Sequence, residues 1–355
     1  MRIRRRAVLA GLAGGVAIRP LAAVAGFPAP EAAYVAARKD GAGYAAALIS
    51  ATGETLLRAG LPGRGHGAAV SPDKATAVVF ARRPGAFALA LDVAGRRAAA
   101  SFAPPAGRHF YGHGAFSADG RLLYATENDF DAARGVVGVY ETDGWRRVGE
   151  FETHGVGPHE MLLMADGRTL AVANGGIETH PETPRLKLNL ATMAPSLVYL
   201  DSRTGDLLER VETPAALHRL SIRHMAEAPG GEIWWGGQWE GPAGDRPPLI
   251  GVHRRGGEMT LVGASAMPAL ANYVGSVAAN PLSDEVAATS PRGGVVLIWD
   301  AAARELVDMR AMPDACGVAR AGEAFAVSDG RGILHMSSGE RSEAGVAWDN
   351  HLVPV

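Results

Sequence analysis

A short motif that recurs along the chain constrains its fold more than any other feature of the sequence. In its clearest copy, Gly112–Arg121, a histidine between two glycines precedes a short apolar run and an Asp-Gly turn. Near copies occupy residues 65–74 and 157–168, so that successive histidines are 47 and 46 residues apart. A repeat of roughly 40–50 residues built from short strands is typical of a β-propeller, in which each repeat forms one four-stranded blade.

Runs of β-forming residues separated by turn residues continue this pattern along the chain. Six sets of runs begin at comparable positions, which are His66, His113, His159, His224, Tyr273 and Ala315. Three further runs precede these sets, at 34–38, 44–49 and 55–59, and a single run, 348–353, follows them. Because ring closure removes open edges, we expect the last run to be the inner strand of a blade whose outer strands are N-terminal. The sequence therefore predicts an all-β, seven-bladed β-propeller, and scarce helical periodicity argues against a TIM barrel or a doubly wound sheet.

One leader and one insert complete the predicted organisation. Residues 1–25 combine consecutive arginines, a modest apolar run and the small residues Ala23-Val24-Ala25. This pattern predicts a twin-arginine signal peptide and a periplasmic mature protein, with a Sec signal or a retained anchor as the alternative. We expect residues 26–355 to form one propeller domain, with a polar insert at 175–195 lying over one face.

Composition excludes several classes of protein. Apolar residues make up 47% of the chain and charged residues 20%, as expected of a globular protein with an ample core. A net charge of −2 argues against a nucleic-acid partner, because a protein that binds nucleic acid needs a basic surface. A single cysteine excludes an internal disulfide framework. After the leader, no segment is apolar for long enough to span a membrane. We expect a monomer.

The repeated histidine is the main candidate for chemistry. In a propeller the innermost strand of each blade lines the central channel, and six residues share one position at the start of such strands. They are His66, His113, His159, His224, Cys316 and His351. Imidazole and thiolate ligands suit a transition metal such as iron or copper, and three or four of them are sufficient. The alternative is that these histidines pack between blades and that Cys316 is simply a small buried residue.

Other polar residues lie near the same predicted channel mouth and could support ligands. They are His109, Tyr111, Glu160, Arg223, Gln238, Glu240, Asn272, Tyr273 and Asn350. For several of them, a place on the rim or in a solvated turn is an equal or stronger interpretation. The sequence contains no convincing serine-hydrolase, Walker, zinc-protease, haem-attachment or dinucleotide motif.

Several segments together resemble a known family. They are the arginine-rich leader, Gly157–Glu160, Asn174–Pro181, Ser221–His224, Gln238–Gly241, Tyr273–Val277 and Trp348–His351. In combination they resemble domain-of-unknown-function family 1513, exported seven-bladed propellers encoded beside imelysin-like and other periplasmic iron-uptake proteins. The resemblance implies a role in periplasmic iron or copper acquisition, with imelysin-like proteins as partners. It implies no established catalytic residues.

Three functions remain open at this point. The first is a metal-binding propeller that receives, holds or passes iron or copper. The second is a hydrolase similar to propeller lactonases, in which His159-Glu160, Arg223-His224 and Glu240 would act near the channel. The third is a scaffold that binds a partner protein without chemistry.

Overall fold

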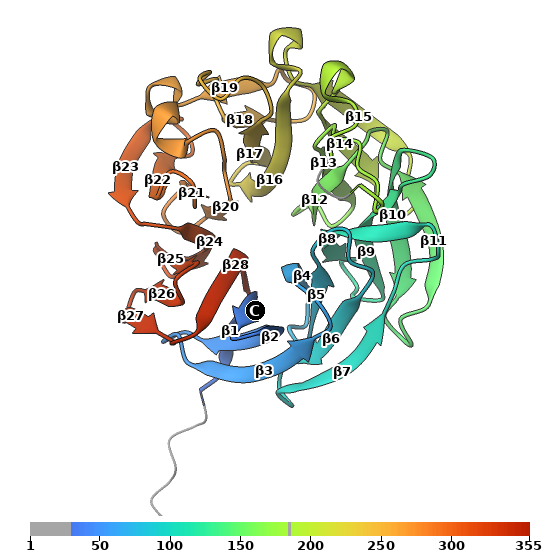
Figure 1. The fold of residues 1–355 in the computed structure, drawn as a ribbon, viewed down its shortest axis with the longest axis vertical. Coiled ribbons are helices and arrows are strands. Elements are labelled where there is room, and N and C mark those ends of the chain that lie inside the picture. Colours follow the sequence, from blue (N-terminus) through green and yellow to red (C-terminus); the bar gives the residue numbers. More distant parts are fainter. Residues whose placement is uncertain (1–29, 184–185) are drawn as a thin grey trace, which may run out of the picture. The chain divides into compact units, whose positions relative to one another are not determined.

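The structure is a computed structural model that describes residues 30–183 and 186–355, so the predicted leader lies outside the described residues. From Glu31 to Val355 the chain forms seven four-stranded antiparallel sheets arranged in a ring (Figure 1). This confirms the predicted all-β, seven-bladed β-propeller. Within the described ranges, no helix is long and apolar enough to span a membrane.

Each blade runs outward from the channel through four strands. The inner strands are β28 (Val346–Pro354), β4 (Gly65–Val70), β8 (Arg108–Phe116), β12 (Pro158–Leu163), β16 (Leu220–Ala228), β20 (Ser276–Asn280) and β24 (Ala315–Ala321). The second strands are β1 (Ala32–Asp40), β5 (Thr76–Ala81), β9 (Leu122–Asp129), β13 (Thr169–Asn174), β17 (Glu232–Trp239), β21 (Glu285–Ser290) and β25 (Ala324–Asp329). The third strands are β2 (Gly43–Ser50), β6 (Ala88–Asp92), β10 (Arg134–Glu141), β14 (Ser196–Asp201), β18 (Ile250–His253), β22 (Val295–Asp300) and β26 (Ile333–Met336). The outermost strands are β3 (Thr55–Leu61), β7 (Arg97–Phe102), β11 (Arg147–Glu152), β15 (Leu207–Glu212), β19 (Thr260–Val262), β23 (Leu306–Ala311) and β27 (Gly339–Ser342).

The ring closes between the two ends of the propeller sequence. Strand β28 pairs antiparallel with β1, with Val353 opposite Val35 and Leu352 opposite Ala36. The first blade therefore has the order β28-β1-β2-β3, as the orphan runs predicted. Pairing at this seam leaves neither β28 nor β1 as an open edge on that side.

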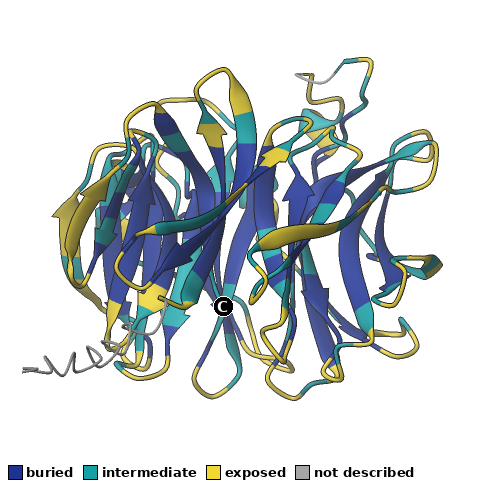
Figure 2. Ribbon diagram, turned by 90° about the horizontal axis from the view of Figure 1, so that it is seen from below, coloured by how far each residue is buried: buried dark blue, intermediate teal, exposed yellow. Residues whose placement is uncertain are grey.

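Burial follows the distance of a strand from the rim. Every residue of β13 and β14 is buried, whereas all four residues of β27 are exposed (Figure 2). Large apolar side chains fill the space between neighbouring blades, and Trp234, Trp235 and Trp299 are fully buried in the largest such core. Burial of these apolar surfaces between blades is the main force that holds the ring together.

The turn of the repeated motif is built by its own side chains. The Asp119 carboxylate accepts hydrogen bonds from the Ser117 hydroxyl (2.6 Å) and from the backbone N–H of Arg121 (3.1 Å). Gly120 has a φ of 70°, a conformation that glycine adopts at little cost. Ser71 donates to Asp73 in the same way, also at 2.6 Å. The Asp-Gly part of the motif is therefore explained by blade geometry.

The fifth inner strand begins later in the structure than the sequence predicts. The fifth set was expected to open at Tyr273, but β20 begins at Ser276. The Tyr273 N–H instead donates to the carbonyl of Leu270, and the Val274 N–H donates to that of Gly237. Part of the backbone before β20 is therefore hydrogen-bonded to β17 of the preceding blade and cannot pair with β21.

The predicted insert connects β13 to β14 and contains a single turn of 3-10 helix, η1 (Leu190–Thr192). Its Thr179 carbonyl accepts a hydrogen bond from the side chain of Asn128 on β9. Its Lys187 forms an ion pair with Glu240, which follows β17. The insert thus contacts the blades on both sides of its own. Two more short helices, η2 (Ala215–Leu217) and η3 (Ala264–Leu270), lie in other connections.

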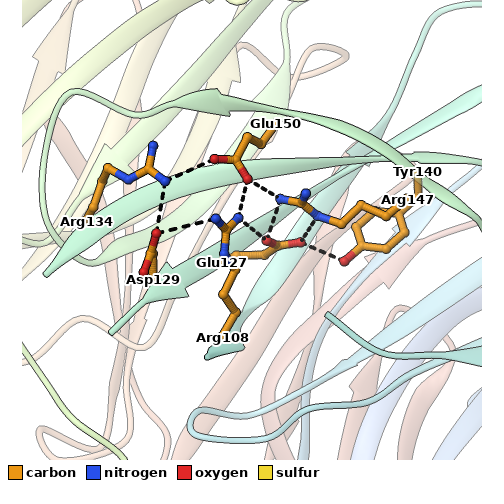
Figure 3. Close-up of polar contacts among 7 residues, drawn as sticks. All are labelled: Arg108, Glu127, Asp129, Arg134, Tyr140, Arg147 and Glu150. Atoms are coloured by element: carbon orange, nitrogen blue, oxygen red, sulfur yellow. Dashed lines mark hydrogen bonds and ion pairs between the residues drawn. The ribbon is translucent and has the colours of Figure 1, made fainter. Parts of the chain in front are cut away.

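One blade contains a dense ionic network on β8 to β11 (Figure 3). The side chain of Glu127 is fully buried, where it accepts hydrogen bonds from Tyr140 (2.6 Å) and Arg147 (3.0 Å). Glu150 binds Arg108, Arg134 (3.0 Å) and Arg147 (2.8 Å). Hydrogen bonding to Arg108 is the main cause that lowers the pKa of Glu150 to about 2.

We expect this network to stabilise the fold above pH 5 and to lose its contribution to the free energy of unfolding in acid. Because the folded pKa of Glu150 lies below its unfolded value of 4.5, its contribution is lost as pH falls from about 5 toward 2. For a group with a 29% exposed side chain, the loss is about 1–2 kcal/mol after solvent screening. Urea unfolding at pH 7 and pH 3 should show a smaller pH effect in Glu150→Gln than in the unmodified protein. Glu323→Gln, at an exposed glutamate, is the control and should keep the full pH effect. A pH effect in Glu150→Gln as large as that of the unmodified protein would contradict this prediction.

Candidate metal centre

Five buried histidines from five consecutive blades meet in the channel. We call them the histidine cluster, and they are His66, His113, His159, His224 and His351. The ring centroids of His113 and His351 are 4.5 Å apart, and those of His159 and His224 are 4.8 Å apart. Even the more distant pair of His66 and His224 is only 6.4 Å apart. Neighbouring imidazoles are therefore close enough to bind the same metal ion.

A break in strand register accompanies each clustered histidine. The shifts fall between Gly65 and Ala68, Phe110 and Gly114, Pro158 and Glu160, Ile222 and His224, and Trp348 and Leu352. Strand β20, which carries no histidine, pairs with β21 without a shift. An extra residue in one strand of a pair re-aims side chains, so these irregularities explain how the imidazoles turn toward the axis.

Two glycines of the motif make room for the rings. A Cβ on Gly67 would lie 2.7 Å from Nδ1 of His113, and a Cβ on Gly112 would lie 2.7 Å from Cδ2 of His66. Gly112 also has a φ of 111°, which other residues rarely adopt. The glycines beside the histidines are therefore required by the close approach of neighbouring inner strands.

The cluster offers two groups of candidate ligand atoms. One group comprises His113, Glu160, His224 and His351, and the other comprises His66, His113 and His159. Within each group the ligand atoms all lie within 4.8 Å of one another. Three or four nitrogen and oxygen donors at such separations are enough for a transition metal.

A buried carboxylate orients His66. Its Nδ1 lies 2.7 Å from Oδ1 of Asp349, whose Oδ2 accepts a hydrogen bond from Arg64 at 2.6 Å. Burial alone would raise the pKa of Asp349, but the hydrogen bond to His66 and the charges of Arg64 and Arg82 hold it well below its usual range. Since an ionised carboxylate only accepts, His66 carries its proton on Nδ1 and leaves the Nε2 lone pair free. Metal-binding histidines are commonly oriented in this way.

Glu160 serves the other side of the cluster. Its Oε2 lies 2.9 Å from Nδ1 of His224, and its Oε1 lies 4.0 Å from Nδ1 of His113. Burial raises the pKa of Glu160 to about 8. A cation beside this carboxyl would favour its ionised form.

The imidazoles are neutral at pH 7. Burial, followed by the charges of neighbouring imidazoles, holds the pKa values of His113 and His224 well below their usual range. Burial acts in the same direction on His159 and His351. Neutral imidazole is the form that binds metals.

Three nitrogens of the cluster have no hydrogen-bond partner among the described residues. They are Nε2 of His113, Nδ1 of His159 and Nε2 of His351, and all three are buried. Buried polar atoms are normally paired, so three orphaned nitrogens in one cluster require an explanation. A bound metal ion would use the lone pairs that the protein leaves free, and the residues present therefore fit such an ion.

Glu160 and His351 also line a cavity of about 250 Å³. Its other walls include residues 276–279 of β20 and 318–320 of β24, which belong to the two blades without a clustered histidine. Small side chains such as Ala278 and Ala319 leave this space open. The cavity gives an ion or small ligand an approach to the cluster.

Cys316 lies apart from both ligand groups that the described residues form. Its thiol points to Asp314, with 3.9 Å between Sγ and Oδ1. Burial raises its pKa above the usual range, so it remains a thiol. The next residue, Gly317, contributes bare backbone against β28, because a Cβ there would lie 2.6 Å from the carbonyl carbon of His351.

Of the other predicted residues, Tyr111, Arg223 and Asn350 stand one or two positions before a clustered histidine, and Glu240 and Tyr273 contact two of them. Tyr111 is buried, and its hydroxyl has no hydrogen-bond partner among the described residues. Asn350 donates to the Tyr273 hydroxyl at 2.6 Å. Arg223 lies 3.6 Å from Glu240.

The remaining predicted residues support the scaffold. His109 pairs with the carbonyl of Phe110 and the amide of Asn128, outside the cluster. Gln238 forms a backbone bridge with Tyr273, and Asn272 donates its side-chain amide to the carbonyl of Ala243.

Sequence reasoning missed two residues that contact the site, Asp349 and Arg64. Each stands two positions before a clustered histidine, His351 and His66 respectively. Alternation along a regular strand places residues i and i+2 on one face, but Arg64 precedes β4 and the register of β28 shifts around Asp349, so this signal was weak for both.

Comparison with known proteins identifies the fold and the family. No curated protein gave a match. The hydrazine synthase structure from Kuenenia stuttgartiensis has a TM-score of 0.61 at 14% identity, covering 85% of this chain and 94% of that one. The WD40 repeats of RRP9 have a TM-score of 0.56, also at 14% identity, covering 92% and 95%. These identities support a shared fold alone. The model of one protein family matches residues 59–355, and the chain thus belongs to the family described as "Protein of unknown function (DUF1513)".

Proposed function

We propose that this protein is a periplasmic metal-binding propeller that holds an iron or copper ion in its channel for acquisition, storage or transfer. The observation that carries the proposal is the convergence of five buried, neutral imidazoles, three of which present nitrogens that no described residue hydrogen-bonds.

The donor set favours iron over copper(I). The four-residue group supplies three imidazoles and the carboxylate of Glu160, and Cys316 is outside it. Imidazole with carboxylate is a common environment for iron(II), whereas copper(I) prefers thiolate or thioether. Asp349 orients His66 of the three-histidine group and Glu160 contacts His224 of the four-residue group, so one imidazole of each group is held in place before the ion arrives.

The cavity beside Glu160 and His351 supports transfer as well as storage. It leaves one side of the ligand group open, whereas structural metal sites are usually closed by four protein ligands. The twin-arginine pattern of residues 1–25 supports the periplasmic location, and the family resemblance supports imelysin-like proteins as exchange partners.

Metal loading tests the proposal. Protein isolated from its native periplasm, and metal-free protein incubated anaerobically with iron(II) and then dialysed, should each retain about one equivalent of metal by elemental analysis. Copper(I) and zinc, loaded in parallel, establish the order of preference. Absence of stoichiometric metal under every condition would overturn the proposal, and turnover of a sugar lactone by the metal-free protein would indicate the hydrolase instead.

A further inference from the structure

A second polar group lies in the channel on the other side of the histidine cluster from the cavity. Residues that follow clustered histidines, such as Glu160 and Leu352, line the cavity. Residues that precede clustered histidines, such as Tyr111, Arg223 and Asn350, lie on the opposite side along the same strands. This second group is rich in arginine and tyrosine.

Arg223 is a buried cation with an incomplete counter-charge. The residue is 7% exposed, its guanidinium lies 3.6 Å from Glu240, and its Nε has no partner among the described residues. The other oxygen of Glu240 is already engaged by Lys187. A buried guanidinium normally makes close, paired hydrogen bonds to an anion. Its charge is therefore only partly balanced by the protein.

Arg82 and Arg83 lie at the same mouth. They follow β5, and the Arg82 N–H donates to the carbonyl of Arg64 at 2.8 Å. The following residue of this turn, Gly85, accepts from the N–H of Phe110 at 3.1 Å, which places the turn against β8. The charge of Asp349 acts on Arg82 from nearby, and Arg83 is half-buried.

The charges of these arginines act on shared neighbours. Arg83 acts on both Arg223 and Tyr111, and Arg82 acts on Tyr273. Arg83 also lines a small cleft with His109 and Thr179, beside the strand that carries Tyr111. Tyr111 and Arg223 stand one or two positions before clustered histidines, Tyr273 contacts Asn350 in the same position, and the turn of Arg82 and Arg83 bonds to Arg64 and to β8. We call these three arginines and two tyrosines the arginine mouth (Arg82, Arg83, Tyr111, Arg223 and Tyr273).

Both tyrosines present hydrogen-bond donors. The Tyr111 hydroxyl is buried beside the Thr179 side chain and makes no hydrogen bond of normal geometry to the described residues. The Tyr273 hydroxyl accepts from Asn350 at 2.6 Å and keeps its own proton for another acceptor. Of the neighbouring carboxylates, Asp349 binds His66 and Arg64, whereas Glu240 binds Lys187 through Oε2 and directs Oε1 toward Arg223.

We propose that the arginine mouth is a binding site for a small oxyanion, bound through a carboxylate or phosphate group by the arginines and the tyrosine hydroxyls. An anion there would supply the charge that buried Arg223 lacks and would accept the protons of two phenols. Guanidinium groups suit both carboxylate and phosphate because their donors form a planar fork. This site is independent of metal in the histidine cluster and goes beyond the proposed function.

Calorimetry on metal-free protein at low ionic strength tests this inference. Citrate and inorganic phosphate, titrated separately, distinguish a carboxylate from a phosphate ligand, and at least one should bind saturably with one equivalent. Arg223→Gln and Arg83→Gln should each weaken that binding by about 10-fold or more. Arg97→Gln, at an exposed arginine of β7, should leave it unchanged.

Two results would overturn the inference. One is the absence of binding by either anion at concentrations up to about 10 mM. The other is binding by Arg83→Gln that matches the unmodified protein. Arg83 is only partly buried, so its variant tests the site even if Arg223→Gln does not fold. Because no metal is present, failure here leaves the metal-loading result unaffected.

Discussion

Replacing His113 and His224 together with alanine is expected to abolish stoichiometric metal binding. His113 belongs to both groups of candidate ligand atoms, and His224 is the imidazole that contacts Glu160. The double variant leaves His351 and Glu160 in the first group and His66 and His159 in the second. Affinity should fall by more than about 100-fold, since loss of a partner that only orients a ligand already costs roughly 10–100-fold. Elemental analysis after dialysis and titration with iron(II) measure the effect.

Two further variants separate lost ligands from lost structure. His113→Gln with His224→Gln keeps more of the side-chain volume and should also lose the metal, while its thermal unfolding stays closer to that of the unmodified protein. His218→Ala, at a histidine on the connection before β16, should retain about one equivalent. Full metal retention by either double variant would show that the cluster is not the site.

Ending the chain after Gly345 is expected to prevent formation of the ring. The deletion removes β28 and leaves β1 without its inner partner. It also removes the buried side chains of Trp348 and Leu352. Loss of one buried tryptophan and one buried leucine costs about 5–10 kcal/mol, which is comparable with a total domain stability of about 5–15 kcal/mol. Circular dichroism and urea unfolding should show no cooperative native transition.

A synthetic peptide provides the matched control for this deletion. A peptide of residues 346–355 should restore cooperative unfolding when added in trans, because an extended segment can complete an open sheet edge. The same peptide with Trp348→Ser and Leu352→Ser should not. Unfolding of the shortened chain at the same urea concentration as the full chain would show that the pairing of β28 with β1 is not needed for a stable fold.

The fold was predictable because its signals are local and repeated. The Ser117-Asp119-Gly120 turn recurs with nearly constant spacing, and the hydrogen bonds within it need no distant partner. The three unmatched runs at the N-terminal end and the single run at the C-terminal end add up to the four strands of one blade, so their pairing could be predicted. The late start of β20 could not be foreseen, since it depends on backbone bonds to β17 in another blade.

The site was only partly predictable. The repeat pattern aligned Cys316 with the histidines, but it cannot tell which of two adjacent residues faces the axis when a strand is irregular. In β24 the register shifts between Ala315 and Val318, and the glycine beside the cysteine approaches His351. The contact between His66 and Asp349 joins residues 283 positions apart, so no local pattern contains it.

The position of β28 in chain order sets when the four-residue ligand group can be complete. This strand brings both His351 and the Asp349 carboxylate, and it reaches His66 only by crossing back to the first blade. During synthesis the histidines of the earlier blades emerge before His351 and Asp349 have been made. The group of His113, Glu160, His224 and His351 is thus complete only after ring closure, so that an ion held by all four residues would report a completely folded propeller.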